Sequence, residues 1–159
     1  MSQTFLDATL IDELIAKARS APRQRSHHNL HGDAGDPAHR LLVAIEPDSY
    51  VRPHCHLDPN KAETIIPLRG RLGALVFDAA GAVLEARELT PDGTAFGFHV
   101  QPGVFHSVVA LESGTVFVEI KAGPYAVPLA AEWGAWAPAE GEPGVPACLA
   151  AMKAAISPS

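Results

Sequence analysis

The chain of 159 residues has little of several residue types, and each shortage narrows the class of protein. Its two cysteines, Cys55 and Cys148, are too few for the disulfide framework of a small secreted scaffold, so we expect two free thiols. The longest apolar runs are far shorter than the roughly 20 residues that cross a bilayer, so we expect no membrane partner. Residues 1–5 lack the charge and the apolar stretch of a signal peptide, which favours a cytoplasmic location.

Positive charge is also scarce. Twelve Lys and Arg residues stand against 18 Asp and Glu, giving a formal net charge of −6. No basic stripe is present that could neutralise phosphates, so we expect no nucleic-acid partner. The apolar content of 47% is ordinary for a soluble globular protein, and the length suits one core with extensions.

Most of the chain is a series of short β-like runs separated by turns that contain Gly, Pro, Asp or Asn. The expected strands are 40–45, 50–56, 63–68, 72–77, 83–89, 94–100, 105–111 and 115–121. Strands this short and regular, with no helix between them, predict an all-β fold, an antiparallel sandwich or barrel.

Three regions are expected along the chain. Residues 1–37 hold an amphipathic helix at 6–19 and then a polar segment. Residues 38–122 form the barrel. Residues 123–159 form an irregular arm with two tryptophans that anchor it to the barrel and a short Ala-rich helix at 147–156.

Four residues have the order of a metal site. His54 and His56 are two apart, so on a strand both side chains point to one face. Glu63 and His106 each stand near the start of a later strand. Three imidazoles and one carboxylate predict a site for a divalent ion, with iron, manganese, nickel and zinc all suitable. A set of hydrogen-bonded structural histidines is the alternative.

The same residues resemble the two motifs of the cupin superfamily. His54, His56, Glu63 and Gly70 match the first motif, although the spacing from His56 to Glu63 is longer, and Gly103 with His106 matches the second. This resemblance implies a single double-stranded β-helix, or jelly-roll barrel, and the four metal ligands named above.

A second resemblance covers more of the chain, from about residue 4 to Pro138. Ser-His-His-Asn-Leu-His at 26–31, Ser-Tyr-Val-Arg-Pro-His at 49–54, Leu-Arg-Gly-Arg-Leu at 68–72 and Lys-Ala-Gly-Pro-Tyr at 121–125 are similar to the WbuC family of cupin-fold metalloproteins. Members often occur with O-antigen or other surface-polysaccharide genes. The resemblance therefore implies a role in polysaccharide biosynthesis and no particular reaction.

Five further residues are candidates for the site. His28 and Asn29 lie in the polar segment, which is either a lid over the barrel mouth or a solvated loop; His28 would act as an acid or base and Asn29 would contact substrate. Arg52, two residues before His54, would clamp a carboxylate or phosphate, unless it pairs with Glu46 or Glu119. Lys61 would contact substrate, or be solvated. Tyr125 would close the site, or pack on the barrel end.

Several functions remain open at this point. The first is a metal-dependent isomerase, epimerase or lyase acting on a small sugar or sugar nucleotide. An iron-dependent small-molecule dioxygenase and a non-catalytic sensor that binds a small acid are the alternatives. A metal-free epimerase fits poorly, since it would not need this ligand set. Because jelly-roll domains often pair through sheet edges, we expect a homodimer.

Overall fold

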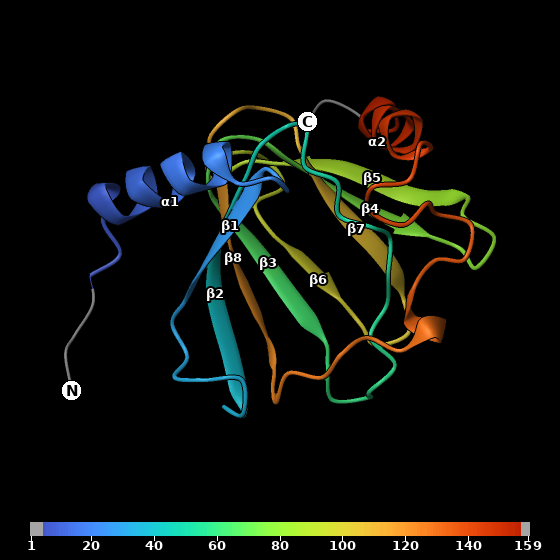
Figure 1. Cartoon of the computed structure of the whole chain (residues 1–159), viewed down its shortest axis with the longest axis horizontal. Helices are drawn as coiled ribbons and strands as arrows, with labels where there is room; N and C mark the ends of the chain where they lie inside the picture. Colours follow the sequence, from blue (N-terminus) through green and yellow to red (C-terminus); the bar gives the residue numbers. More distant parts are fainter. Residues whose placement is uncertain (1–4, 157–159) are drawn as a thin grey trace.

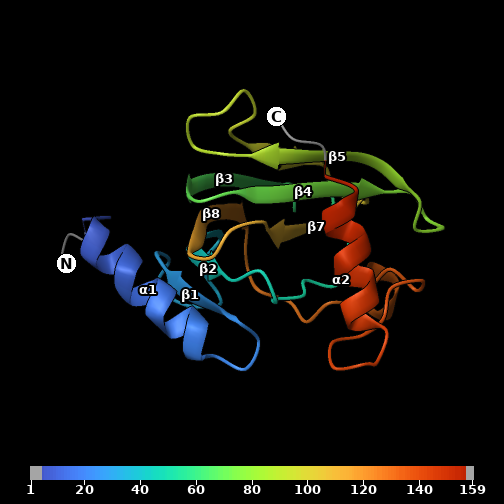
Figure 2. The same ribbon diagram turned by 90° about the horizontal axis from the view of Figure 1, so that it is seen from above.

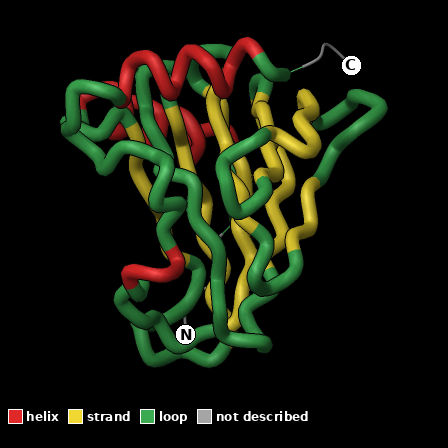
Figure 3. The backbone as a smooth tube through the Cα atoms, turned by 90° about the vertical axis from the view of Figure 1, so that its right-hand side faces the viewer, coloured by secondary structure: helices red, strands yellow, loops and turns green. Residues whose placement is uncertain are grey.

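The alternating sequence pattern forms two antiparallel sheets, which the computed structural model describes within residues 5–156 (Figure 1). The larger sheet has the strand order β1-β2-β8-β3-β6 and the smaller one β5-β4-β7. Their bounds are β1 Arg25–Asn29, β2 Ala38–Ile45, β3 Glu63–Arg69, β4 Leu72–Phe77, β5 Val83–Leu89, β6 Phe98–Val100, β7 Phe105–Ala110 and β8 Thr115–Ala122. In Figure 3 the strands run side by side and the loops gather at their two ends. The predicted all-β fold is confirmed.

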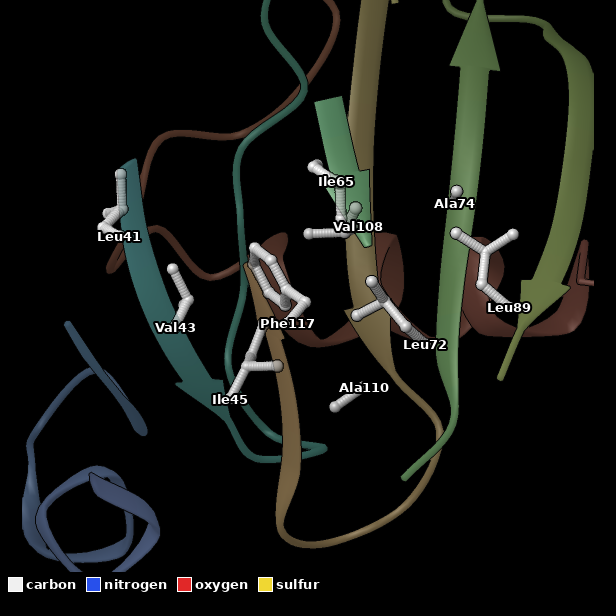
Figure 4. Close-up of a cluster of buried hydrophobic side chains, with 10 residues drawn as sticks. All are labelled: Leu41, Val43, Ile45, Ile65, Leu72, Ala74, Leu89, Val108, Ala110 and Phe117. Atoms are coloured by element: carbon white, nitrogen blue, oxygen red, sulfur yellow. The ribbon is translucent and has the colours of Figure 1, made fainter. Parts of the chain in front are cut away.

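The core lies between the two sheets. Every second residue of β2 points inward, and the inner faces of the other strands meet them in one cluster (Figure 4). Its buried members are Leu41, Val43, Ile45, Ile65, Leu72, Ala74, Leu89, Val108, Ala110 and Phe117. Further along β8 the inward positions change from Phe117 to Glu119 and Lys121, which line a cavity at one end of the barrel.

Two helices cover the outer faces (Figure 2). Helix α1, Ala8–Ser20, begins later than predicted because the side chain of Asp7 caps it by accepting a hydrogen bond from the Leu10 N–H at 3.0 Å. Its buried face packs against the outer side of β2 and β8. Helix α2, Val145–Ala154, packs against the outer side of β4 and β7 together with Trp136. Neither helix has the length and apolar character that a membrane crossing requires.

Two predicted strands differ from the structure. Residues 50–56 form an extended segment that joins β7 only at His54, with N···O distances of 3.0 and 2.8 Å to His106. Pro53 has no N–H to donate to a ladder, which prevents continuous pairing. Only Phe98–Val100 of the predicted strand 94–100 pairs, because the chain turns at 91–94 and residues 95–97 pair with no described strand.

The polar segment before the barrel contains a strand. Residues Arg25–Asn29 pair along their whole length with β2, so that β1 is an edge of the larger sheet. His27 lies opposite Val43 and His28 opposite Leu42. Since neighbouring residues of a strand face opposite sides, this pairing decides which histidine faces the cavity.

Candidate metal centre

The four predicted ligands come together at one end of the barrel. The extended segment 50–56 carries His54 and His56, β3 starts with Glu63, and His106 is the second residue of β7. One potential ligand atom from each residue lies within 4.8 Å of those of the other three. Three separate parts of the chain therefore contribute to a single cluster.

The backbone orients two of the imidazole rings. His54 Nδ1 donates to the Arg52 carbonyl and His106 Nδ1 to the Val104 carbonyl, each at 2.9 Å. A carbonyl only accepts, so Nδ1 carries the hydrogen in both rings and a neutral ring leaves its Nε2 lone pair available. Burial, followed by the nearby His106, lowers the pKa of His54 to about 3, so that this ring stays neutral.

Glu63 is 3% exposed and faces two of the three ligand histidines, His56 and His106, and one lysine. Its Oε2 lies 2.9 Å from His56 Nε2 and 3.5 Å from Lys121 Nζ, and its Oε1 lies 3.7 Å from His106 Nε2. Burial alone would raise the pKa of Glu63, but these neighbours outweigh burial and hold it well below its usual range. The carboxylate is thus ionised and ready to bind a cation.

The donor set fits a divalent ion. His106 Nε2 is buried and has no hydrogen-bond partner within residues 5–156, since 3.7 Å is too long for a hydrogen bond. Buried polar atoms normally have a partner. A metal ion among the four ligand atoms would provide one, and neutral imidazoles with one carboxylate suit iron, manganese, nickel and zinc alike.

Two adjacent cavities lie beside the cluster. The inner one, about 100 Å³, is lined by His54, Glu63 and His106 and by apolar side chains of the core. The outer one, about 410 Å³, opens on the side of β1. Five residues line both cavities: Arg25, His27, His54, Glu119 and Lys121. We call the outer cavity the mouth.

The strand pairing of β1 places His27, and not His28, at the mouth. Arg25, His27 and Asn29 line it, whereas Ser26 lies on the other face and donates through Oγ to the Leu14 carbonyl of α1 at 2.8 Å. His28 shares that face with Ser26. The structure therefore does not bring His28 to the cluster. No strand was predicted for residues 25–29, so the sequence could not show which of their side chains face the cavity.

Arg52 also lies away from the cavities at the cluster. Its guanidinium group is 5.4 Å from the ring centre of Trp133 and donates to the Gly134 carbonyl at 3.4 Å. Neither alternative pairing is present among the described residues, since Glu46 binds Arg19 and Glu119 binds Lys121. Arg52 thus contacts the C-terminal arm near His54, whose ring lies 5.9 Å from that of Trp133.

The remaining three predicted residues lie at the rim. Asn29 and Tyr125 line the mouth, and Tyr125 is 60% exposed. Lys61 lines an adjoining cavity of about 280 Å³ with His56 and Tyr125, and its Nζ donates to the Pro124 carbonyl at 2.8 Å. The structure thus brings Asn29, Lys61 and Tyr125 close to the cluster without assigning them a role.

Besides His27, three residues of the site were not predicted: Glu119, Lys121 and His39. Lys121 lies 2.6 Å from Glu119 on the inner face of β8. His39 is opposite Lys121 in the β2–β8 ladder, is 5% exposed and has an Nε2 without a hydrogen-bond partner in the described chain. The alternation of Phe117, Glu119 and Lys121 was a signal in the sequence, because polar residues at inward positions indicate a site.

Comparisons with solved structures support the fold. KdgF from Halomonas sp. is 16% identical with a TM-score of 0.52, over 67% of this chain and 85% of that chain. A conserved Streptococcus pyogenes protein of unknown function, SPY1581, is 12% identical with a TM-score of 0.51, over 79% of this chain and 92% of that chain. Likeness at these identities concerns the fold alone.

The fold and the cluster together define the class of protein. Two facing antiparallel sheets of this kind, with cupin-fold structures as neighbours, make this a cupin-fold protein with a candidate divalent-metal site. The chain belongs to the family described as domain of unknown function DUF6016, whose profile matches residues 6–89. The matched part includes His54, His56 and Glu63 and ends before His106. No curated protein matches the chain.

Proposed function

We propose that this protein is a metal-dependent enzyme that acts on a small, oxygen-rich substrate, a sugar or a sugar nucleotide. The observation that supports this most strongly is the cluster of His54, His56, Glu63 and His106 beside a cavity that opens through a polar mouth. The motifs similar to the WbuC family favour surface-polysaccharide biosynthesis as the setting. Iron, manganese, nickel or zinc would be the cofactor.

In this proposal the residues around the cluster have different roles. A divalent ion held by the four ligands would supply Lewis-acid polarisation of a substrate oxygen. His27 lies where the mouth meets the inner cavity, so we assign it the proton transfer. Burial, followed by Arg25, Arg23 and Lys121, lowers the pKa of His27, which keeps its ring neutral and able to accept a proton. Asn29, Lys61 and Tyr125 would contact the substrate at the rim.

The first experiment tests the metal. Protein purified without a histidine tag or chelator is analysed for metals, beside a double variant His54→Ala/His106→Ala and a control, His99→Ala. His99 is an exposed histidine of β6 that contacts Thr64 rather than the cluster. Near-stoichiometric metal in wild type and control, lost in the double variant, is expected. Wild type that neither carries nor takes up metal would overturn the proposal.

The second experiment tests turnover. The metal-loaded protein is incubated with hexoses, hexuronates and nucleotide sugars in deuterated water, and NMR follows exchange of carbon-bound hydrogen and new products. Isomerisation, epimerisation and lyase reactions that proceed by the proton transfer assigned to His27 exchange a carbon-bound hydrogen with solvent. Deuterium should therefore enter at least one substrate class, and His27→Gln should slow it. A metal-loaded protein that exchanges and converts none of them would contradict the enzymatic role.

A further inference from the structure

The inner cavity is too small for a whole substrate. A volume of about 100 Å³ lies well below the roughly 300–1,000 Å³ of small-molecule pockets. The mouth, at about 410 Å³, falls in the usual range of ligand pockets. A ligand that reaches the cluster must therefore leave most of its atoms in the mouth, and the residues there would recognise it.

The mouth gathers positive charge in a chain whose formal net charge is −6. Arg23, Arg25 and Lys121 line it together with a single carboxylate, Glu119. All three cations lie near His27, and each of them lowers the pKa of its imidazole.

The two arginines are balanced only in part by their internal partner, whereas Lys121 contacts two carboxylates, Glu119 and Glu63. Glu140 lies outside the mouth and binds both arginines, so one carboxylate serves two guanidinium groups. Arg25 also donates hydrogen bonds from Nη1 to Ser49 Oγ and to the Tyr50 carbonyl. These bonds hold its charged group in place beside the mouth. The arginines therefore contribute an excess positive charge to the wall.

Two polar groups at the mouth can each form a further hydrogen bond. Lys121 Nζ has three hydrogens, of which Glu119 at 2.6 Å and Glu63 at 3.5 Å account for two. Next to it on β2, the imidazole of His39 is 95% buried, and its Nε2 has no partner within the described residues. A buried polar atom of this kind needs a partner, and a ligand in the mouth can provide one.

We propose that the mouth is an anion-recognition site: it binds a carboxylate or phosphate group of a small-molecule ligand, with Lys121 and His27 as contacts and Arg25 as a fixed charge. This inference rests on the proposed function, because the other end of the ligand would reach the metal cluster. It narrows the substrate class to anionic molecules, such as acidic sugars or phosphorylated sugars.

Calorimetric titration of metal-free protein tests the inference. The probes are succinate, its uncharged analogue succinamide, and inorganic phosphate. We expect succinate or phosphate to bind and succinamide not to bind, with affinity that falls as salt rises because the interaction is electrostatic. The tighter of the two anions identifies the group as carboxylate or phosphate.

Matched variants locate the site. Lys121→Met and His27→Gln should each weaken anion binding by about tenfold, as expected for loss of one charge-assisted or partly buried contact of about 1.4 kcal/mol. Lys17→Met, an exposed lysine of α1, and His28→Gln, on the opposite face of β1, should leave binding unchanged. Because Lys121 contacts Glu63, His27→Gln provides the test if Lys121→Met fails to fold.

The outcomes separate this inference from the proposed function. Equal binding of succinate and succinamide, no binding of either anion, or equal effects of His27→Gln and His28→Gln would each overturn the anion site. Metal uptake is measured on a separate portion of each protein after reconstitution with metal. If the protein holds metal but binds no anion, only the anion site is refuted. If it binds anions but takes up no metal, only the metalloenzyme proposal is refuted.

Discussion

Gly70 and Gly103 show how single residues shape the turns that lead to and from the ligand strands. Both have positive φ angles, 77° and 80°, in the left-handed region that favours glycine. Their surroundings differ. A Cβ at Gly70 would lie 2.8 Å from the Cα of Thr115, whereas a Cβ at Gly103 would meet nothing within 4 Å.

The two glycines give a matched prediction. Gly103→Ala should lower the free energy of unfolding by about 1–2 kcal/mol, from backbone strain alone. Gly70→Ala should lower it by about 2–5 kcal/mol, because overpacking against Thr115 adds about 1–3 kcal/mol. Urea unfolding of both variants measures the difference. Equal losses would show that contact with Thr115 has no energetic weight.

His54 predicts a pH dependence of the metal-free protein. Its ordinary pKa is 6.5 and its pKa in the fold is about 3, so between these values the unfolded chain binds one more proton. Stability should therefore fall as the pH drops from about 6.5 towards 3, by up to about 1.4 kcal/mol per pH unit. Urea unfolding in the presence of a chelator measures this slope, which should be shallower in His54→Gln. Parallel curves for the two proteins would contradict it.

At the scale of elements, Glu140 connects the C-terminal arm to β1. It lies 2.7 Å from Arg23 Nε and 2.6 Å from Arg25 Nη2, between segments more than a hundred residues apart. Partial burial raises the pKa of Glu140, but the two arginines outweigh burial and lower it. The ionised carboxylate therefore stabilises the attachment of the arm.

Glu140→Gln should reduce the free energy of unfolding at pH 7 by about 1–2 kcal/mol, a figure discounted for the exposure of Arg23. A carboxylate with a lowered pKa contributes stability above its ordinary pKa of 4.5 and loses it as the pH falls through its lower pKa in the fold. The gap between variant and wild type should begin to narrow below about pH 4.5 and close as the pH falls through the pKa of Glu140 in the fold. Glu13→Gln, on the exposed face of α1, serves as the control and should change stability by less than about 0.5 kcal/mol.

At the scale of the whole molecule, the cluster joins parts of the barrel that are distant in sequence. Ligands come from the extended segment, from β3 and from β7, and these belong to both sheets. An ion that binds only the folded chain stabilises it by mass action, by about 2.7 kcal/mol at a hundredfold excess over the dissociation constant. Chelation should therefore lower the melting temperature of wild type. His106→Ala should show no such change, and an equal effect of chelator on both would place the ion elsewhere.

The assembly state is also a prediction for the whole molecule. Both sheets have edge strands, among them β1 in the larger sheet and β5 in the smaller. Exposed edges can pair with another copy, so we expect a homodimer. Sedimentation velocity measures the mass directly. A single species of 16.8 kDa over a wide concentration range would refute the dimer.

The sequence by itself determined the strand series, the all-β class and the four residues of the cluster. Alternation of apolar and polar residues is a local property, and it predicted β4 and β5 with their full bounds. His54 and His56 were readable from their spacing, because side chains two residues apart in extended backbone point to one side. Glu63 and His106, each near the start of a later expected strand, completed the set, and the resemblance to cupin motifs supported it.

The tertiary structure alone decided which neighbours reach the cluster. The register between β1 and β2 placed His27 at the mouth and His28 on the other face, a choice that one residue of slip would reverse. The pairing of β2 with β8 brought His39 beside Lys121, although about eighty residues separate them. Packing of the C-terminal arm placed Trp133 beside Arg52, a contact between residues distant in sequence. These outcomes depend on strand partners and on packing, and no local pattern in the sequence encodes either.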